Sequence, residues 1–160
     1  MSAIISNCQK YRYLLEREVR AIPMIGDRGL LLWIMLNPST ADANNNDQTI
    51  RKCIGFSSRN NFSRFRVVNL FAYRATKPAD LWRARDPIGP ENNEHIVNAA
   101  IDAKVVVVAW GNHKKAEQRA KQVVEMLANM LIQPLCLGKN NNGSPRHPCM
   151  IPYSQALEEF

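Results

Sequence analysis

The chain has 160 residues, of which 46% are apolar, and a formal net charge of +7. This length is typical of one domain, and a domain of this size buries about 70% of the surface that its unfolded chain exposes. No apolar run approaches the roughly 20 residues that a membrane-spanning helix needs, and residues 1–10 lack the pattern of a secretory signal. We therefore expect a single cytoplasmic domain over residues 1–160, without a membrane partner.

Two strand-like segments open the chain. Residues 11–19 and 30–36 flank the turn signal Gly26-Asp27-Arg28-Gly29, so the sequence predicts an N-terminal antiparallel hairpin. The second segment is almost wholly apolar, which is typical of a central strand covered on both faces. A helix is predicted over residues 47–60, because apolar side chains recur there at helical spacing after Asp47, the expected N-cap.

Strands and helices then alternate. Strands are predicted over residues 66–71, 105–109 and 134–137, and helices over 92–102 and 114–131, with a long proline-containing loop after the first strand. The side chains expected to face inward from these two helices are Ile96, Val97, Ala100, Ile101, Ala116, Ala120, Val123, Val124, Leu127 and Leu131. This order predicts an α/β fold, a three-layer α/β/α sandwich with a mainly parallel central sheet.

Polar clusters follow the predicted strands. In parallel sheets of this kind, ligands bind beyond the carboxyl ends of the strands. Each cluster could serve only to cap a turn or a helix, but amides and histidines that converge at one sheet edge would form a polar pocket. The clusters are Asn37-Pro38-Ser39-Thr40 with Asp42 and Asp47, then Asn69-Leu70-Phe71, Trp110-Gly111-Asn112-His113 and Pro145-Arg146-His147-Pro148.

Positive charge is concentrated in residues 51–85, where nine Lys and Arg residues stand against one acid, Asp80, which gives the segment +8. Its aromatic residues would suit a surface that tracks phosphates and stacks bases, and the alternative is a solvated basic face with its aromatics in the core. These aromatics are Phe62, Phe65, Phe71, Tyr73 and Trp82. The candidates for nucleic-acid binding are Arg51, Lys52, Arg59, Arg74, Lys77 and Arg146.

No cofactor or metal is expected. The glycine-rich nucleotide-binding loops and the nucleophile elbow of serine hydrolases are missing from the sequence, although Ser39 with His147 stays open as a nucleophile and its base. The four cysteines lack paired ligand spacing and are interpreted as reduced thiols. The alternative is a zinc site formed on folding by Cys136, Cys149, His113 and His147.

Four blocks of the sequence resemble the bacterial and phage family called domain of unknown function 1643. They span nearly the full length of the chain, and that family carries no established activity. The blocks are Leu36-Asn37-Pro38-Ser39-Thr40-Ala41-Asp42-Ala43, Val68-Asn69-Leu70-Phe71-Ala72, Ala109-Trp110-Gly111-Asn112-His113 and Pro145-Arg146-His147-Pro148.

A more distant resemblance is to the uracil-DNA glycosylase superfamily, whose motifs occur in the same order. Met35-Leu36-Asn37-Pro38-Ser39 is similar to its water-positioning Gly-x-Asn-Pro-Gly motif, and Asn69 is similar to the asparagine that reads the uracil edge. Val107-Val108-Ala109-Trp110-Gly111 resembles its strand-then-Trp-Gly segment, and His147-Pro148 resembles the opening of its His-Pro-Ser motif. Met35 and Ser39 stand where the superfamily motif has glycines, and Cys149-Met150 stands where it has Ser-Pro after the histidine. Binding of a nucleobase, a nucleoside or a single strand would survive these departures better than penetration of a duplex.

This second resemblance implies a uracil-DNA-glycosylase-like fold and hydrolysis of an N-glycosidic bond. Asn37 would hold the attacking water, and His147 would stabilise charge on the departing base. Asp42 or Asp47 would act as general base.

The same resemblance implies that the ligand is a nucleobase in DNA or in a nucleotide-like molecule. Asn69 would bind the edge of the base, with Phe71, Trp110 and His113 as its other base-binding contacts. Two alternatives stay open: a non-catalytic nucleic-acid or nucleotide-binding module, and an enzyme that acts on small nucleosides.

Overall fold

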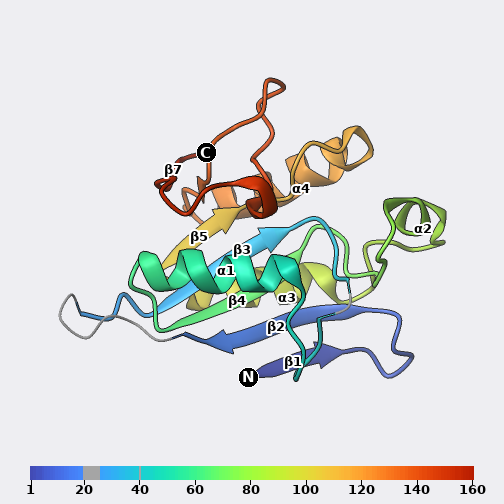
Figure 1. Ribbon diagram of the computed structural model, residues 1–160. Helices are drawn as coiled ribbons and strands as arrows, with labels where there is room; N and C mark the ends of the chain where they lie inside the picture. Colours follow the sequence, from blue (N-terminus) through green and yellow to red (C-terminus); the bar gives the residue numbers. More distant parts are fainter. Residues whose placement is uncertain (20–25, 40) are drawn as a thin grey trace.

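The computed structural model describes residues 1–19, 26–39 and 41–160, and the strands of this part form one seven-stranded sheet in the order β1-β2-β4-β3-β5-β6-β7 (Figure 1). The inner strands β4, β3, β5 and β6 are parallel to one another, and antiparallel strands flank them at both edges. The expected α/β architecture with a mainly parallel central sheet is confirmed. The strands are β1 (Ser2–Ile5), β2 (Arg12–Glu18), β3 (Leu30–Met35), β4 (Arg64–Asn69), β5 (Val105–Val108), β6 (Leu135–Cys136) and β7 (Glu158–Glu159).

Helices cover both faces of the sheet. Every residue of β3 is buried, and its side chains alternate between two cores. Leu32 and Ile34 pack on the side of α3 and α4, whereas Trp33 packs on the side of α1, which lies in front of the sheet in Figure 1. No helix of the described residues is long and apolar enough to span a membrane. The helices are α1 (Gln48–Arg59), α2 (Pro78–Arg83), α3 (Asn92–Asp102) and α4 (Glu117–Asn129), with 3-10 turns at Lys114–Ala116 and Pro148–Met150.

The hairpin predicted from residues 11–19 and 30–36 is wrong. β2 pairs in antiparallel fashion with β1 on one side and β4 on the other, so the N-terminal hairpin is β1–β2. The parallel crossover from β3 through α1 to β4 inserts β4 between β2 and β3, where Val67 is paired with both Leu15 and Trp33. Residues 20–25, part of the predicted turn region, lie outside the described residues, as does Thr40.

The antiparallel direction of β2 has a consequence for the sheet edge. The parallel strands β3, β4 and β5 have their carboxyl ends on the same side of the sheet, and the antiparallel strand β2 begins on that side. The backbone N–H of Arg12, the first residue of β2, donates to the carbonyl of Ala72, three residues after the end of β4. The start of β2 therefore joins the strand ends at which ligands of parallel sheets bind.

The local predictions hold best for the helices. Asp47 caps α1 as expected, since its Oδ1 accepts a hydrogen bond from the N–H of Ile50 at 2.9 Å. Two residues expected to face inward are instead exposed, Ile101 at 66% and Leu131 at 95%. Leu131 has a φ of 56° beyond the end of α4, so helical periodicity no longer applies to it. Sequence analysis also missed β1, β7 and α2, which lies in the predicted proline-containing loop.

A buried arginine holds the loop that leads into α1. Arg17 is only 1% exposed, and its guanidinium donates to Asn46 Oδ1 at 2.7 Å and to the carbonyls of Asp42, Asn45 (3.2 Å), Glu16 and Ser2. Buried polar groups are tolerated when their hydrogen bonds are satisfied, and here one side chain satisfies several. Arg17 therefore ties β2 to residues 42–46.

Arg17→Met should lower the free energy of unfolding by about 2–4 kcal/mol, because it leaves partly buried carbonyls of this loop without their donor. Chemical denaturation monitored by circular dichroism measures the change. The matched control is Arg64→Met, which removes an exposed guanidinium from β4 and should change stability by less than about 0.5 kcal/mol. Equal losses in the two variants would contradict this role of Arg17.

Candidate functional site

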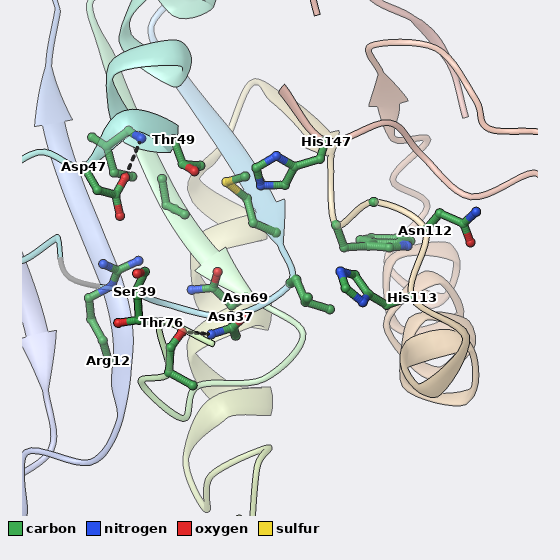
Figure 2. A pocket seen from close by; sticks show the side chains of 17 residues that line it. Arg12, Asn37, Ser39, Asp47, Thr49, Asn69, Thr76, Asn112, His113 and His147 are labelled. Atoms are coloured by element: carbon green, nitrogen blue, oxygen red, sulfur yellow. Dashed lines mark hydrogen bonds between the residues drawn. The ribbon is translucent and has the colours of Figure 1, made fainter. Parts of the chain in front are cut away.

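A cavity of about 370 Å³ opens at the edge where the parallel strands end (Figure 2). Asn37, Asn69 and His147, which were predicted to converge, all line it. In Figure 2 these side chains come from separate segments of the chain and surround one space. The polar residues of the lining are Arg12, Asn37, Ser39, Asp47, Thr49, Asn69, Thr76, Asn112, His113 and His147.

Asn37 is held in one orientation by the backbone. Its Nδ2 donates to the carbonyl of Ala75 at 2.7 Å and to that of Pro38 at 3.0 Å. These bonds connect the loop after β3 to the loop after β4. Because both amide protons are used in this way, Oδ1 is fixed as the acceptor of this side chain.

Asn69 and Arg12, which both line the cavity, each have a buried side-chain nitrogen without a hydrogen-bond partner among the described residues. Asn69, the last residue of β4, is 1% exposed, and its Nδ2 has no hydrogen-bond partner among the described residues. Arg12 is 2% exposed; its Nη1 donates to the carbonyl of Ala41 at 2.6 Å, but its Nε likewise finds no partner in the described part of the chain. A buried donor without a partner costs about 1–3 kcal/mol, so both atoms favour a ligand that carries acceptors.

Arg12 also brings a positive charge. Burial lowers its pKa to about 10, and Asp47 opposes that shift while Arg74 adds to it. A guanidinium with this pKa is still protonated at neutral pH. The cavity therefore combines one buried cation with neutral amides.

His147 contributes a neutral donor. Its Nδ1 accepts from the backbone N–H of Cys149 at 3.4 Å, which places the proton of the neutral ring on Nε2. Burial lowers the pKa of His147 below its ordinary value, and the neighbouring His113 lowers it further, whereas Asp47 opposes the shift. His147 is thus a neutral imidazole at pH 7 that can donate one hydrogen bond to a ligand.

The carboxylate at the cavity is Asp47, because Asp42 is turned to its own loop. The side chain of Asp42 accepts hydrogen bonds from the backbone of Asn44 and Asn45, both at 2.9 Å, and these bonds lower its pKa. Asp42 does not line the cavity. Asp42, predicted as a catalytic residue, is therefore not among the lining residues, whereas Asp47, its alternative, lines the cavity while it caps α1.

Of the ring side chains predicted to contact a base, two line the cavity and one does not. Trp110 forms part of the cavity wall and packs edge-on against Phe160, with ring centroids 5.7 Å apart. His113 lines the cavity as well. Phe71 does not, because it is buried in the core beside α3 and α4 and packs against Trp82 at 5.3 Å. Phe71, predicted as a base-binding residue, is thus not among the lining residues.

Several side chains of the basic segment, residues 51–85, pack in the core or contact other parts of the protein. Phe62 and Phe65 are fully buried, so the alternative of a segment with its aromatics in the core holds for them. Lys52 Nζ donates to the carbonyl of Ile151 at 2.6 Å, and Arg59 lies 4.2 Å from the ring centre of Tyr153.

The other candidates for nucleic-acid binding are spread over the surface. Arg51, Lys77 and Arg146 are exposed. Arg74 is half-buried and lines a second hollow beside the cavity. None of the six candidates lines the cavity itself.

The zinc alternative has no support in the structure. Among the described residues no group of three or more His, Cys, Asp or Glu side chains could hold a metal ion. Cys136 is fully buried in the core, and Cys149 Sγ lies 3.3 Å from Thr49 Oγ1. All four cysteines are free.

Sequence reasoning missed Arg12, Thr49, Thr76 and the contribution of Asn112 to the lining. The signal for Arg12 was a charged residue inside the predicted strand over residues 11–19. It could not be used without the direction of β2, which decides whether residue 12 or residue 18 reaches the site.

Asn69→Leu should leave the free energy of unfolding unchanged or raise it by about 1 kcal/mol, because it removes an unpaired buried donor. Thermal and chemical denaturation measure this. The matched control is buried Asn92, whose Nδ2 donates to the carbonyls of Asn69 and Leu70, so Asn92→Leu should cost about 2 kcal/mol. A loss at Asn69 as large as that at Asn92 would refute the assignment of an orphaned donor.

The ring of His147 should titrate with a midpoint below about 6.5, the value of an unperturbed histidine. The unfolded chain then binds more protons than the folded one just below that pH, so the free energy of unfolding should fall as the pH drops through about 6.5. Nuclear magnetic resonance of the histidine rings measures the midpoint, with His147→Gln to identify the signal. A midpoint at or above 6.5 would show that the ring is not desolvated.

In the comparison with known proteins, one family model matches the chain over a range that includes the whole site. The family described as "Protein of unknown function (DUF1643)" matches residues 12–149, a range that contains every residue of the cavity lining. No curated protein and no solved structure matches the chain. On the strength of the family match, the chain belongs to the DUF1643 family.

Proposed function

We propose that the cavity binds a nucleobase and that the protein hydrolyses the N-glycosidic bond between that base and its sugar. The observation that carries the proposal is that Asn37, Asn69 and His147 line one cavity although they are far apart in sequence. At these three positions the sequence also resembles the uracil-DNA glycosylase superfamily. The cavity, at about 370 Å³, is within the size range of small-molecule sites.

Recognition follows from the unpaired donors. The edge of a pyrimidine such as uracil presents carbonyl oxygens, which are acceptors. Asn69 Nδ2 and Arg12 Nε are buried donors that need acceptors. A ligand with two carbonyl groups would satisfy both, and an analogue without them would leave both donors unpaired at a cost of about 1–3 kcal/mol each.

The chemistry requires a positioned water and a stabilised leaving group. Water attacks the anomeric carbon while the bond from that carbon to the base nitrogen breaks, and the electron pair of this bond leaves with the base. Asn37 Oδ1 accepts a hydrogen bond from the water, and Asp47 is the carboxylate at the cavity to which its proton can pass. The products are the free base, which takes up a proton, and a sugar with a hydroxyl group at the anomeric carbon.

His147 acts on the departing base. As a neutral ring with its proton on Nε2, it can donate a hydrogen bond to an oxygen of the base as negative charge develops there. One such donor contributes about 3 kcal/mol to the transition state, roughly a hundredfold in rate. Arg12 adds a buried positive charge to the same cavity.

One observation favours a second function, binding without turnover. Asp47, the carboxylate among the described lining residues, already accepts a hydrogen bond from Ile50 as the N-cap of α1. If this bond keeps it from serving as a base, the same cavity would bind a nucleobase or nucleotide and release nothing. The two functions share recognition and differ only in product formation.

Free base should appear when the protein is incubated with single-stranded oligonucleotides that each carry one uracil, hypoxanthine or alkylated base, and chromatography with mass detection measures it. Asn37→Ala should lower the rate at least about a hundredfold, because the water loses its acceptor. The matched control is Asn98→Ala, which removes an exposed asparagine from α3 and should leave the rate unchanged.

Two other outcomes have distinct meanings. Binding of an oligonucleotide by the wild-type protein without release of base would support the binding module and refute the enzyme. Neither binding nor release across the panel would refute both functions.

A further inference from the structure

A second hollow, of about 440 Å³, adjoins the cavity. The two share Ser39, Ala75 and Thr76 as a common wall. The other residues that line the hollow are Gln9, Lys10, Tyr73 and Arg74. The cavity and the hollow are therefore adjacent, and two hydroxyl-bearing side chains, Ser39 and Thr76, belong to the wall that they share.

The charge of the hollow differs from that of the cavity. Two cationic side chains, Lys10 and Arg74, line it, and no carboxylate is among its lining residues. Neither cation forms an ion pair with any residue that the structure describes. The carboxylate of Asp42, which interacts with Arg74 electrostatically, is held by the backbone of Asn44 and Asn45. The hollow thus has two cations that form no ion pair among the described residues.

The two cations are held together by the backbone. The N–H of Arg74 donates to the carbonyl of Lys10 at 2.9 Å, and Tyr11 forms an antiparallel bridge with Tyr73. Arg74 Nη1 donates to the carbonyl of Gln9 at 3.3 Å, which leaves the other donors of the guanidinium to the hollow. A guanidinium, an ammonium group and the hydroxyls of Ser39 and Thr76 are donors suited to phosphate oxygens.

We propose that this hollow binds a phosphate group of the ligand whose base occupies the cavity, so that the substrate is a nucleotide rather than a free nucleoside. The inference rests on the proposed function, because the phosphate is placed relative to a base in the cavity. The phosphate is an ester of the same sugar, either of a mononucleotide or of a nucleotide within a strand. Two residues that are close in sequence would then contact different parts of the ligand. Lys10, in the hollow, would bind the phosphate, and Arg12, in the cavity, would bind the base.

Calorimetric titration with three probes tests the inference: deoxyuridine, deoxyuridine 5′-monophosphate and a single-stranded oligonucleotide with one uracil. Wild-type protein should bind the two phosphorylated probes at least about tenfold more tightly than deoxyuridine. Lys10→Gln with Arg74→Gln should remove this preference and leave the affinity for deoxyuridine unchanged. The monophosphate and the oligonucleotide distinguish a small nucleotide from a strand, and only the strand should show a steep loss of affinity with added salt.

The matched control is Lys104→Gln with Arg64→Gln, which removes the same two charges from the opposite edge of the sheet, where β5 and β4 begin. It should retain the preference for phosphorylated probes. If Arg74→Gln perturbs folding, as melting curves would show, Lys10→Gln alone should still weaken binding of the monophosphate, since the side chain of Lys10 is exposed.

The outcomes separate this inference from the proposed function. Equal affinity of wild-type protein for deoxyuridine and its monophosphate would overturn the phosphate site and leave base binding intact. Retention of the preference in the double variant would do the same. Failure to bind any of the three probes would overturn the base site and, with it, the inference.

Discussion

The buried guanidinium of Arg12 at the edge of the sheet is the constraint from which the site follows. A charged group that is 2% exposed is stable only where hydrogen bonds and charge compensate its loss of hydration. The carbonyl of Ala41 satisfies one nitrogen of this cavity-lining residue, Asp47 provides an opposing charge, and Nε stays unpaired among the described residues. Together with the orphaned Nδ2 of Asn69, it makes this edge a place where the free protein lacks acceptors that a ligand can supply.

The residues behind the cavity hold its walls in position. Asn92 donates to the carbonyls of Asn69 and Leu70 from the start of α3, and Arg119 of α4 donates to Leu70 at 2.9 Å. The end of β4 is therefore fixed by two helices on the face opposite α1. Asn37 likewise connects the loop after β3 to the loop after β4, because its Nδ2 donates to the carbonyl of Ala75. Such second-layer hydrogen bonds keep a polar site in one geometry before the ligand arrives.

Positive charge is dense along residues 51–85 of the sequence, but few of these side chains lie beside the cavity in the structure. Some of the basic side chains that give residues 51–85 a charge of +8 are engaged within the protein. Arg66 forms ion pairs with Glu16 and Asp102, both at 2.6 Å, and Lys52 binds a backbone carbonyl. The cations that stand beside the cavity are Arg74 from this segment and Lys10 from outside it. Proximity to the site, rather than density along the chain, decides which charges can meet a ligand.

The sequence by itself determined the buried strands, the start of α1 at Asp47 and the polar residues Asn37, Asn69 and His147 that follow strand ends, because these depend on short-range periodicity and capping. Only the tertiary structure decided that β2 pairs with β4 instead of β3, and hence that Arg12 reaches the site. It also decided that Asp47 rather than Asp42 faces the cavity and that Phe71 lies in the core. Strand order and loop direction depend on pairings between residues distant in sequence, and local patterns carry no information on which of two compatible partners a strand will take.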